Sequence, residues 1–129
     1  MILLETSALI EAWRKNGRAD AKARVESALR SGRAALCQPV VLELSAGLRK
    51  PEEFKLLQDY LEVLPLLPVS DAVWQLAAKR GRLFRASGLT VSNFDTLIFA
   101  TAEHHNANIV TIDRHFAQMR EVLRTETQE

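Results

Sequence analysis

Residues 1–13, MILLETSALIEAW, contain the feature around which the expected fold is built. Residues 1–4 form an apolar run typical of a short buried strand, and residues 7–13 have the composition of a helix start. Glu5 stands between them, directly before a Thr-Ser pair, where the strand should leave the core. Glu is not a favoured helix cap. The carboxylate at this position therefore needs another explanation.

The rest of the chain alternates short apolar runs with longer stretches of helical spacing, which predicts an α/β domain with a mainly parallel sheet. We expect about four or five short central strands flanked by helices. The candidate strands are residues 2–4, 34–37, 64–67 and 109–111. The candidate helices are residues 7–13, 19–31, 39–48, 51–62, 71–86, 94–104 and 114–123. Pro51 suits a first helical position, and Gly88 suits a helix stop.

Length and composition predict a single globular domain over residues 1–129, with 47% hydrophobic and 26% charged residues. A net charge of +1 favours no particular class of partner. The one cysteine, Cys37, excludes an internal disulfide and is expected to be buried, as in a protein of a reducing cytosol. Glu5 interrupts the apolar N-terminus and no run reaches the roughly 20 apolar residues of a membrane span. We expect a cytoplasmic protein without a signal peptide or a membrane partner.

Four acidic residues adjoin the expected strands. Glu5 follows the first strand directly, and Asp113 follows the last one almost directly. Asp95 lies at the start of helix 94–104, and Glu43 lies in the helix after the second strand. Because the loops at the carboxyl ends of parallel strands converge, these four carboxylates are expected to meet at one edge of the sheet.

Each acid also has a simpler explanation. Asp95 fits the third position of a capping box that begins at Ser92, and Asp113 taken alone is better explained as an N-cap. Glu43 lies at the margin of a buried helix face, where a carboxylate costs free energy unless it is paired. An ion pair with an arginine is the alternative for Glu43 and for Glu5.

A divalent cation would explain all four carboxylates together. Without one, gathered carboxylates repel each other and raise each other's pKa values. Mg²⁺ and Mn²⁺ favour oxygen ligands, and a bound metal can activate water against a phosphorus atom. The pattern therefore predicts Mg²⁺- or Mn²⁺-dependent hydrolysis of phosphodiester bonds.

Five stretches, in this order, cover essentially the whole chain: LLETSALIEA, PVVLELSAGLRKPEEF, LPLLPVSDAVWQLAA, GLTVSNFDTLIFATAEHHNANIVTID and DRHF. This ordered set resembles the PIN-domain ribonucleases, and among them the small VapC toxins of toxin–antitoxin pairs. The resemblance implies a PIN-like α/β/α sandwich and a Mg²⁺- or Mn²⁺-dependent endoribonuclease.

By position, the resemblance implies that the catalytic, metal-binding residues are Glu5, Glu43, Asp95 and Asp113. It also implies that two small polar residues, Thr6 and Ser7, help to hold the first acid, and that Thr111 lines the same edge.

The chain departs from the family pattern at Glu5, where the family has Asp. The additional methylene moves the carboxylate by roughly 1.5 Å, and a displacement of about 1 Å can cost on the order of a hundredfold in rate. A natural variant that still binds metal, a deliberately weakened toxin and a degenerate site all remain open at this point.

Basic residues near the acids are candidates for RNA contacts, which would bind phosphate without reading sequence. Arg114 and His115 are the first choice because they adjoin Asp113, and Arg49 with Lys50 follow the helix of Glu43. A solvated basic face is the alternative for each. The His pair at 104–105 is better explained by a helix end than by a zinc site.

Apolar residues outside the expected core stripes indicate further contacts. Trp13 and Trp74 are expected in the core or at a subunit contact, and Leu42 points away from the buried stripe of its helix. The resemblance implies a homodimer, a cognate VapB-type antitoxin in a hetero-oligomer, an RNA substrate, and operator DNA bound only through the antitoxin.

Two alternatives to an active toxin are kept. The first is a catalytically weakened or inactive PIN module that acts by binding its antitoxin, which Glu5 favours. The second, a phosphoacceptor receiver domain, is disfavoured because the acidic pair it needs after the first strand is missing.

Overall fold

The computed structural model describes residues 1–127, so residues 128–129 of the expected domain range lie outside it. All seven predicted helices are confirmed, and only the end of the last one differs from its predicted position by more than one residue. None of the helices in the described part is long and apolar enough to cross a membrane. The elements, in chain order, are β1 (Ile2–Leu4), α1 (Thr6–Trp13), α2 (Ala19–Arg30), β2 (Ala34–Ala35), α3 (Gln38–Gly47), α4 (Pro51–Val63), α5 (Asp71–Ala86), α6 (Asn93–His104), β3 (Asn108–Val110) and α7 (Arg114–Thr127).

The sheet has three parallel strands in the order β2-β1-β3. The predicted strand at residues 64–67 is reduced to one isolated parallel bridge between Leu36 and Leu66. Pro65 and Pro68 flank this bridge, and a proline has no N–H to donate to a ladder. The sheet is therefore parallel and central, as predicted, but has fewer strands than the four or five expected.

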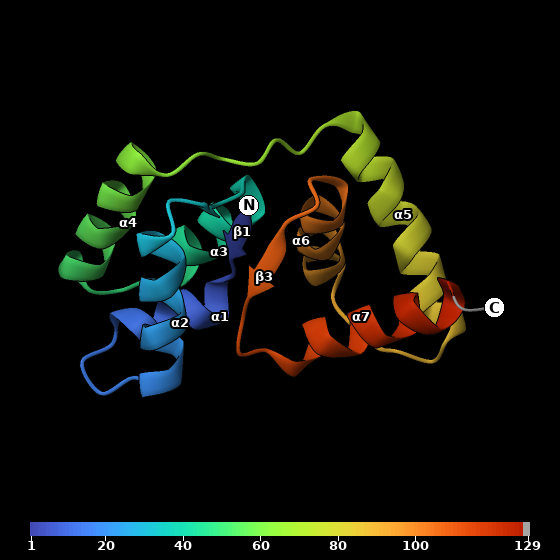
Figure 1. Ribbon diagram of the computed structural model, residues 1–129, viewed down its shortest axis with the longest axis horizontal. Coiled ribbons are helices and arrows are strands. Elements are labelled where there is room, and N and C mark those ends of the chain that lie inside the picture. The colour runs from blue at the N-terminus through green and yellow to red at the C-terminus, as the bar shows by residue number, and fades with distance from the viewer. Residues whose placement is uncertain (128–129) are drawn as a thin grey trace.

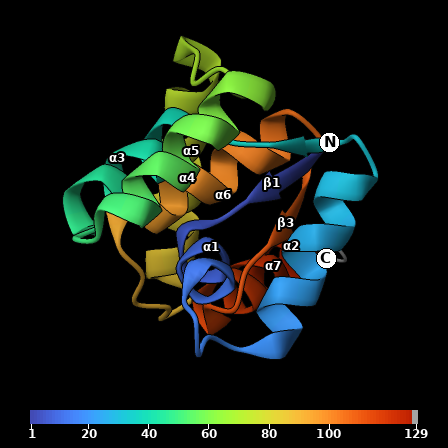
Figure 2. The ribbon, with the colours of Figure 1, turned by 90° about the vertical axis from the view of Figure 1, so that its left-hand side faces the viewer.

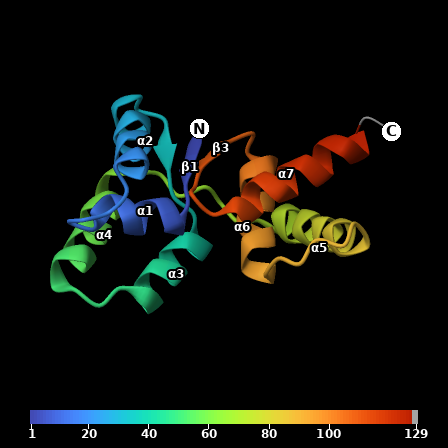
Figure 3. The same cartoon turned by 90° about the horizontal axis from the view of Figure 1, so that it is seen from below.

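Helices cover both faces of this sheet (Figure 1). Figures 2 and 3 show α3, α4 and α6 on one side of β1 and β3, with α2 and α7 on the other. Helix α5 lies at the end of the molecule remote from α4, and the connection between them runs along the molecule (Figure 1). The predicted α/β/α sandwich is confirmed.

The core forms where β1 meets the apolar stripes of the helices. Leu3 and Leu4 are fully buried, and so is Cys37, as predicted. Burial raises the pKa of the Cys37 thiol to about 11, so it is protonated at neutral pH and a poor nucleophile. Trp13 packs edge-on against Tyr60 of α4, with ring centroids 5.2 Å apart.

Helices α5 and α6 form a second packed unit. The Phe84 and Phe99 rings meet edge to face, 5.6 Å apart, and the Arg80 guanidinium donates two hydrogen bonds to the Glu103 carboxylate. Gly88 ends α5 with a φ of 78°, which confirms the predicted helix stop. These contacts fix α6, whose first turn carries Asp95.

Candidate active site

The site lies at the carboxyl ends of β1 and β3. The Glu5 N–H donates to the Val110 carbonyl at 3.0 Å, which continues the pairing of the two strands by one residue. Glu5 and Thr111 are therefore neighbours, although 106 positions separate them in the sequence. The sheet brings the opening and closing segments of the chain together, as the rule for parallel strands predicts.

Glu5 is buried and held by two hydroxyl groups. The residue is only 3% exposed. Its Oε1 accepts hydrogen bonds from Ser7 Oγ and Thr111 Oγ1, each at 2.5 Å. Burial raises the pKa of Glu5, and the two hydroxyl donors oppose part of this effect. Ser7 thus supports the first acid, as expected, and Thr111 lines the same edge.

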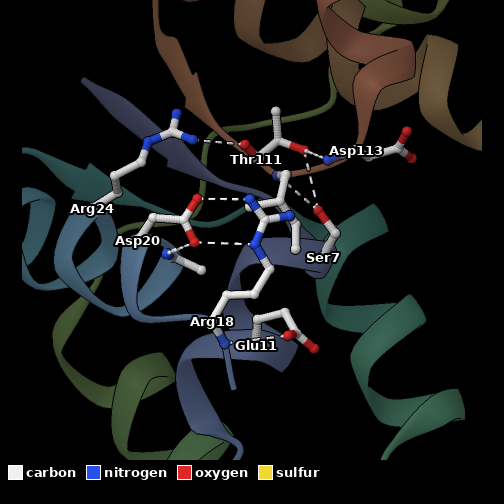
Figure 4. Close-up of polar contacts among 9 residues, drawn as sticks. Ser7, Glu11, Arg18, Asp20, Arg24, Thr111 and Asp113 are labelled. Atoms are coloured by element: carbon white, nitrogen blue, oxygen red, sulfur yellow. Dashed lines mark hydrogen bonds and ion pairs between the residues drawn. The ribbon is translucent and has the colours of Figure 1, made fainter. Parts of the chain in front are cut away.

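The two hydroxyl groups also fix the turn that carries Asp113 (Figure 4). Thr111 Oγ1 accepts from the Asp113 N–H at 3.0 Å, and Ser7 Oγ accepts from the Ile112 N–H at 3.1 Å. Arg24 of α2 donates to the Thr111 carbonyl at 2.9 Å from the other side. The backbone before Asp113 is therefore held from both sides.

Asp113 and Asp95 both lie at the start of helices. The Asp113 Oδ1 accepts from the His115 N–H at 2.9 Å, so the predicted N-cap of α7 is confirmed. Ser92 Oγ accepts from the Asp95 N–H at 3.0 Å, which confirms Ser92 as the N-cap of α6. The two aspartates therefore lie at helix N-termini and also belong to one cluster of possible metal ligands. Asp95, Asp113 and His115 each offer one ligand atom, and these atoms lie within 4.8 Å of one another.

Glu43 of α3 completes the group of acids from another direction. Thr6 Oγ1 donates to the Glu43 Oε1 at 2.6 Å. Thr6 was expected to support Glu5, but in the structure it supports Glu43. Burial is the main cause that raises the pKa of Glu43, and the charges of Asp95 and Asp113 raise it further. Burial, followed by the charge of Asp113, likewise raises the pKa of Asp95. The carboxylates are close enough to repel one another.

No arginine or lysine neutralises this group within residues 1–127. The ion pairs of the described chain include none to Glu5, Glu43 or Asp95, so the arginine alternative is wrong for Glu5 and Glu43. Carboxylate oxygens with one imidazole nitrogen form a donor set that a divalent cation accepts. The donor set and the mutual repulsion both fit a bound divalent cation.

A basic hollow of about 530 Å³ adjoins the acids. It is lined by Arg24, Arg114 and Arg120 next to Thr111 and Asp113. Arg114 was predicted here, whereas Arg24 and Arg120 were missed. Arg24 lies 87 positions from Thr111, and nothing in its local sequence distinguishes it from other exposed arginines on helices.

The other predicted RNA contacts, Arg49 and Lys50, lie apart from this hollow. They line a separate hollow of about 460 Å³ with Arg14 and Lys15, and none of the four predicted acids is among its lining residues. The structure therefore brings Arg114 and His115 to the acids, and does not bring Arg49 and Lys50 there.

An apolar face extends from α3 to α5. Leu42 is 58% exposed and Trp74 is 57% exposed. Together with Pro39, Val69 and Phe94 they line a hollow of about 690 Å³. Leu42 points away from the core, as predicted, and Trp74 is not a core residue.

Comparison with known proteins agrees with this fold. The family model of the PIN domain matches residues 2–122. Ribonuclease VapC11 of Mycobacterium tuberculosis and VapC ribonuclease Mb1587 of Mycobacterium bovis are each 35% identical over 119 residues, which cover 90% of this chain and 89% of theirs.

Solved structures show the same fold at lower identity. FitAcB from Neisseria gonorrhoeae has a TM-score of 0.71 at 23% identity and covers 94% of each chain. VapBC2 from Rickettsia felis, bound to a DNA fragment from its promoter, has a TM-score of 0.72 at 24% identity and covers 88% of this chain and 89% of its own. The chain belongs to the PIN domain family, in its VapC group.

Proposed function

We propose that this chain is the toxin of a type II toxin–antitoxin pair and that it is a Mg²⁺- or Mn²⁺-dependent endoribonuclease. One observation carries the proposal: the carboxylates of Asp95, Asp113 and Glu43 gather at the carboxyl edge of the sheet. Burial and the neighbouring acidic charges raise the pKa values of Glu43 and Asp95, and no Lys or Arg side chain within residues 1–127 pairs with the three acids. The names of the VapC relatives, which are called ribonucleases, support the same conclusion.

The roles of the chain's own residues follow from their positions. Asp95, Asp113 and Glu43 hold the cation, with Glu5 behind them. When bound, the cation supplies a polarised water molecule and offsets negative charge on the phosphate. Thr6, Ser7 and Thr111 hold the carboxylates in place, which matters because misplacement of a reacting group by about 1 Å costs on the order of a hundredfold in rate. Arg114 and His115 face the RNA phosphates.

The partners in this proposal are an antitoxin of the VapB type and a second copy of the chain. The exposed Leu42 and Trp74 form an apolar face that suits a subunit contact. Solved neighbours include toxin–antitoxin complexes bound to DNA. We assign operator DNA to the antitoxin because the net charge of this chain is only +1.

A catalytically weakened module remains the second candidate, and Glu5 is the observation that favours it. Its carboxylate is buried and engaged with two hydroxyl donors. A toxin whose first acid is withdrawn in this way could act by binding its antitoxin.

Cleavage of a labelled structured RNA during Mg²⁺ and Mn²⁺ titrations tests the proposal. The chain, Glu5→Asp and Asp113→Asn are compared, with Glu26→Gln as the control because Glu26 lies on the exposed face of α2. We expect Asp113→Asn to lose about a hundredfold or more of the activity, and Glu26→Gln to keep it. Absence of cleavage by the folded chain and by the folded Glu5→Asp variant would overturn the nuclease and favour the second candidate.

A further inference from the structure

Only two of the three ligand atoms that lie together come from the four predicted acids. The three atoms come from Asp95, Asp113 and His115, and these three residues form the one such group found within residues 1–127. His115 was predicted as an RNA contact. Its imidazole lies on the same side of α7 as the Asp113 carboxylate, with 3.0 Å between Nδ1 and Oδ1.

The spacing between these two atoms fits ligation as well as a hydrogen bond. In octahedral coordination with bonds of about 2.1 Å, two ligand atoms at adjacent corners lie about 3.0 Å apart. A cation could therefore take Nδ1 of His115 and Oδ1 of Asp113 without a large movement of either. The His115 side chain is 39% exposed and the Asp113 side chain is 29% exposed, so both groups are open to solvent and to an entering ion.

Glu5 is placed differently from these residues. Its Oε1 already accepts two short hydrogen bonds, from Ser7 and from Thr111. At 3% exposure it is also the least open of the four acids. A cation at Oε1 would compete with the two hydroxyl donors, and a cation at Oε2 would have to reach a carboxylate in a buried residue. The imidazole of His115 is more exposed, and its Nδ1 has only the 3.0 Å contact with the Asp113 Oδ1.

We propose that His115 is a nitrogen ligand of the divalent cation, together with Asp95 and Asp113, in place of Glu5. The assignment rests on the metal dependence proposed above. Imidazole favours transition metals over Mg²⁺, which prefers oxygen ligands. The site of this chain therefore prefers Mn²⁺ to Mg²⁺.

A positioning role for His115 is the competing explanation. In that case Nδ1–H donates to the Asp113 Oδ1 and only orients a carboxylate ligand, as outer-shell partners of metal sites do. Loss of such a partner also weakens metal binding, typically by about 10- to 100-fold. Affinity alone cannot separate the two roles, and the decisive measurement is whether nitrogen is bonded to the metal.

Pulsed electron paramagnetic resonance of the chain with Mn²⁺ alone, without RNA, makes this measurement. Directly bound nitrogen gives a ¹⁴N modulation, and ¹⁵N-histidine labelling changes it without any substitution. We expect the modulation in the chain and in His104→Gln, and its loss in His115→Gln. His104 is the control because it ends α6, about 14 Å along the helix from Asp95. We also expect His115→Gln to raise the Kd for Mn²⁺ about tenfold, and the Kd for Mg²⁺ by less.

The outcomes distinguish this inference from the proposed function. Bound Mn²⁺ without a nitrogen signal would overturn the ligand role of His115 and leave the metal-dependent nuclease standing. A nitrogen signal from His115 in a chain that cleaves no RNA would support the ligand role and overturn the nuclease. No Mn²⁺ binding at all would overturn both.

Discussion

Replacing Thr111 with valine should destabilise the metal-free protein far more than its position on the sheet edge suggests. The Thr111 hydroxyl donates to the Glu5 Oε1 at 2.5 Å and accepts from the Asp113 N–H at 3.0 Å. Valine has nearly the same shape but neither donates nor accepts. The substitution removes two hydrogen bonds from one atom and leaves a half-buried N–H without its partner.

The expected loss follows from these two bonds. A hydrogen bond to a charged group contributes about 1.5–3 kcal/mol, and an orphaned donor costs about 1 kcal/mol when part of it can still reach water. Since Ser7 still donates to Glu5, we take the lower half of the sum, about 3 kcal/mol. For a chain of 129 residues, this corresponds to a fall in Tm of roughly 10 °C.

Thermal and urea unfolding in the presence of a chelator measure this effect. Thr125→Val is the matched control, because the same substitution there removes only an exposed bond from the Thr125 hydroxyl to the Glu121 carbonyl. We expect the control to change stability by no more than about 0.5 kcal/mol. Combining Thr111→Val with Glu5→Gln should give a coupling energy of at least about 1 kcal/mol. Equal effects of the two valine substitutions would refute the reasoning.

Three further outcomes are expected. Burial raises the native pKa of Glu5 above its ordinary value of 4.5, so just above that pH the native state binds more protons than the unfolded state. The free energy of unfolding therefore falls as the pH rises through the raised pKa, and urea unfolding of the metal-free Glu5→Gln variant across this range should lack the fall. Arg80→Met should cost about 3 kcal/mol by leaving Glu103 unpaired, and the double change Arg80→Met with Glu103→Leu should recover most of it. Fluorescence anisotropy in the presence of a chelator measures how the RNA-binding constant depends on salt. Arg120→Gln should lower the magnitude of the slope of log K against log salt by about 0.7. Arg30→Gln, on the exposed face of α2, should leave the slope unchanged.

The parts of the fold that could be predicted are those that depend on local pattern. Helix starts such as Pro51 and stops such as Gly88 depend on the conformations available to one residue, and the structure has both where they were predicted. The failed fourth strand shows the limit of this approach. Apolar composition suited a strand at residues 64–67, but two prolines left only the Leu66 bridge.

The convergence of the acids on one edge of the sheet could be predicted, but only some of their hydrogen-bond partners could be. Parallel strands place their carboxyl ends together, so Glu5 and Asp113 could be assigned to one edge from the sequence. Which hydroxyl contacts which acid depends on the angle at which each helix leaves the sheet. Thr6 therefore donates to Glu43 rather than to Glu5. Arg24, whose helix has no marked residue pattern, donates to the Thr111 carbonyl.

Competition for lone pairs decides which of the acids attract a cation most strongly. Glu5 has two hydroxyl donors and is removed from solvent, so its charge is already partly compensated by fixed dipoles. Burial and the charge of Asp113 raise the pKa of Asp95, and no Lys or Arg side chain pairs with either acid within the described chain. The free energy gained by adding a positive charge is therefore greatest between Asp95 and Asp113. In the proposed site the cation is therefore expected between Asp95 and Asp113, beside His115, rather than at the buried Glu5.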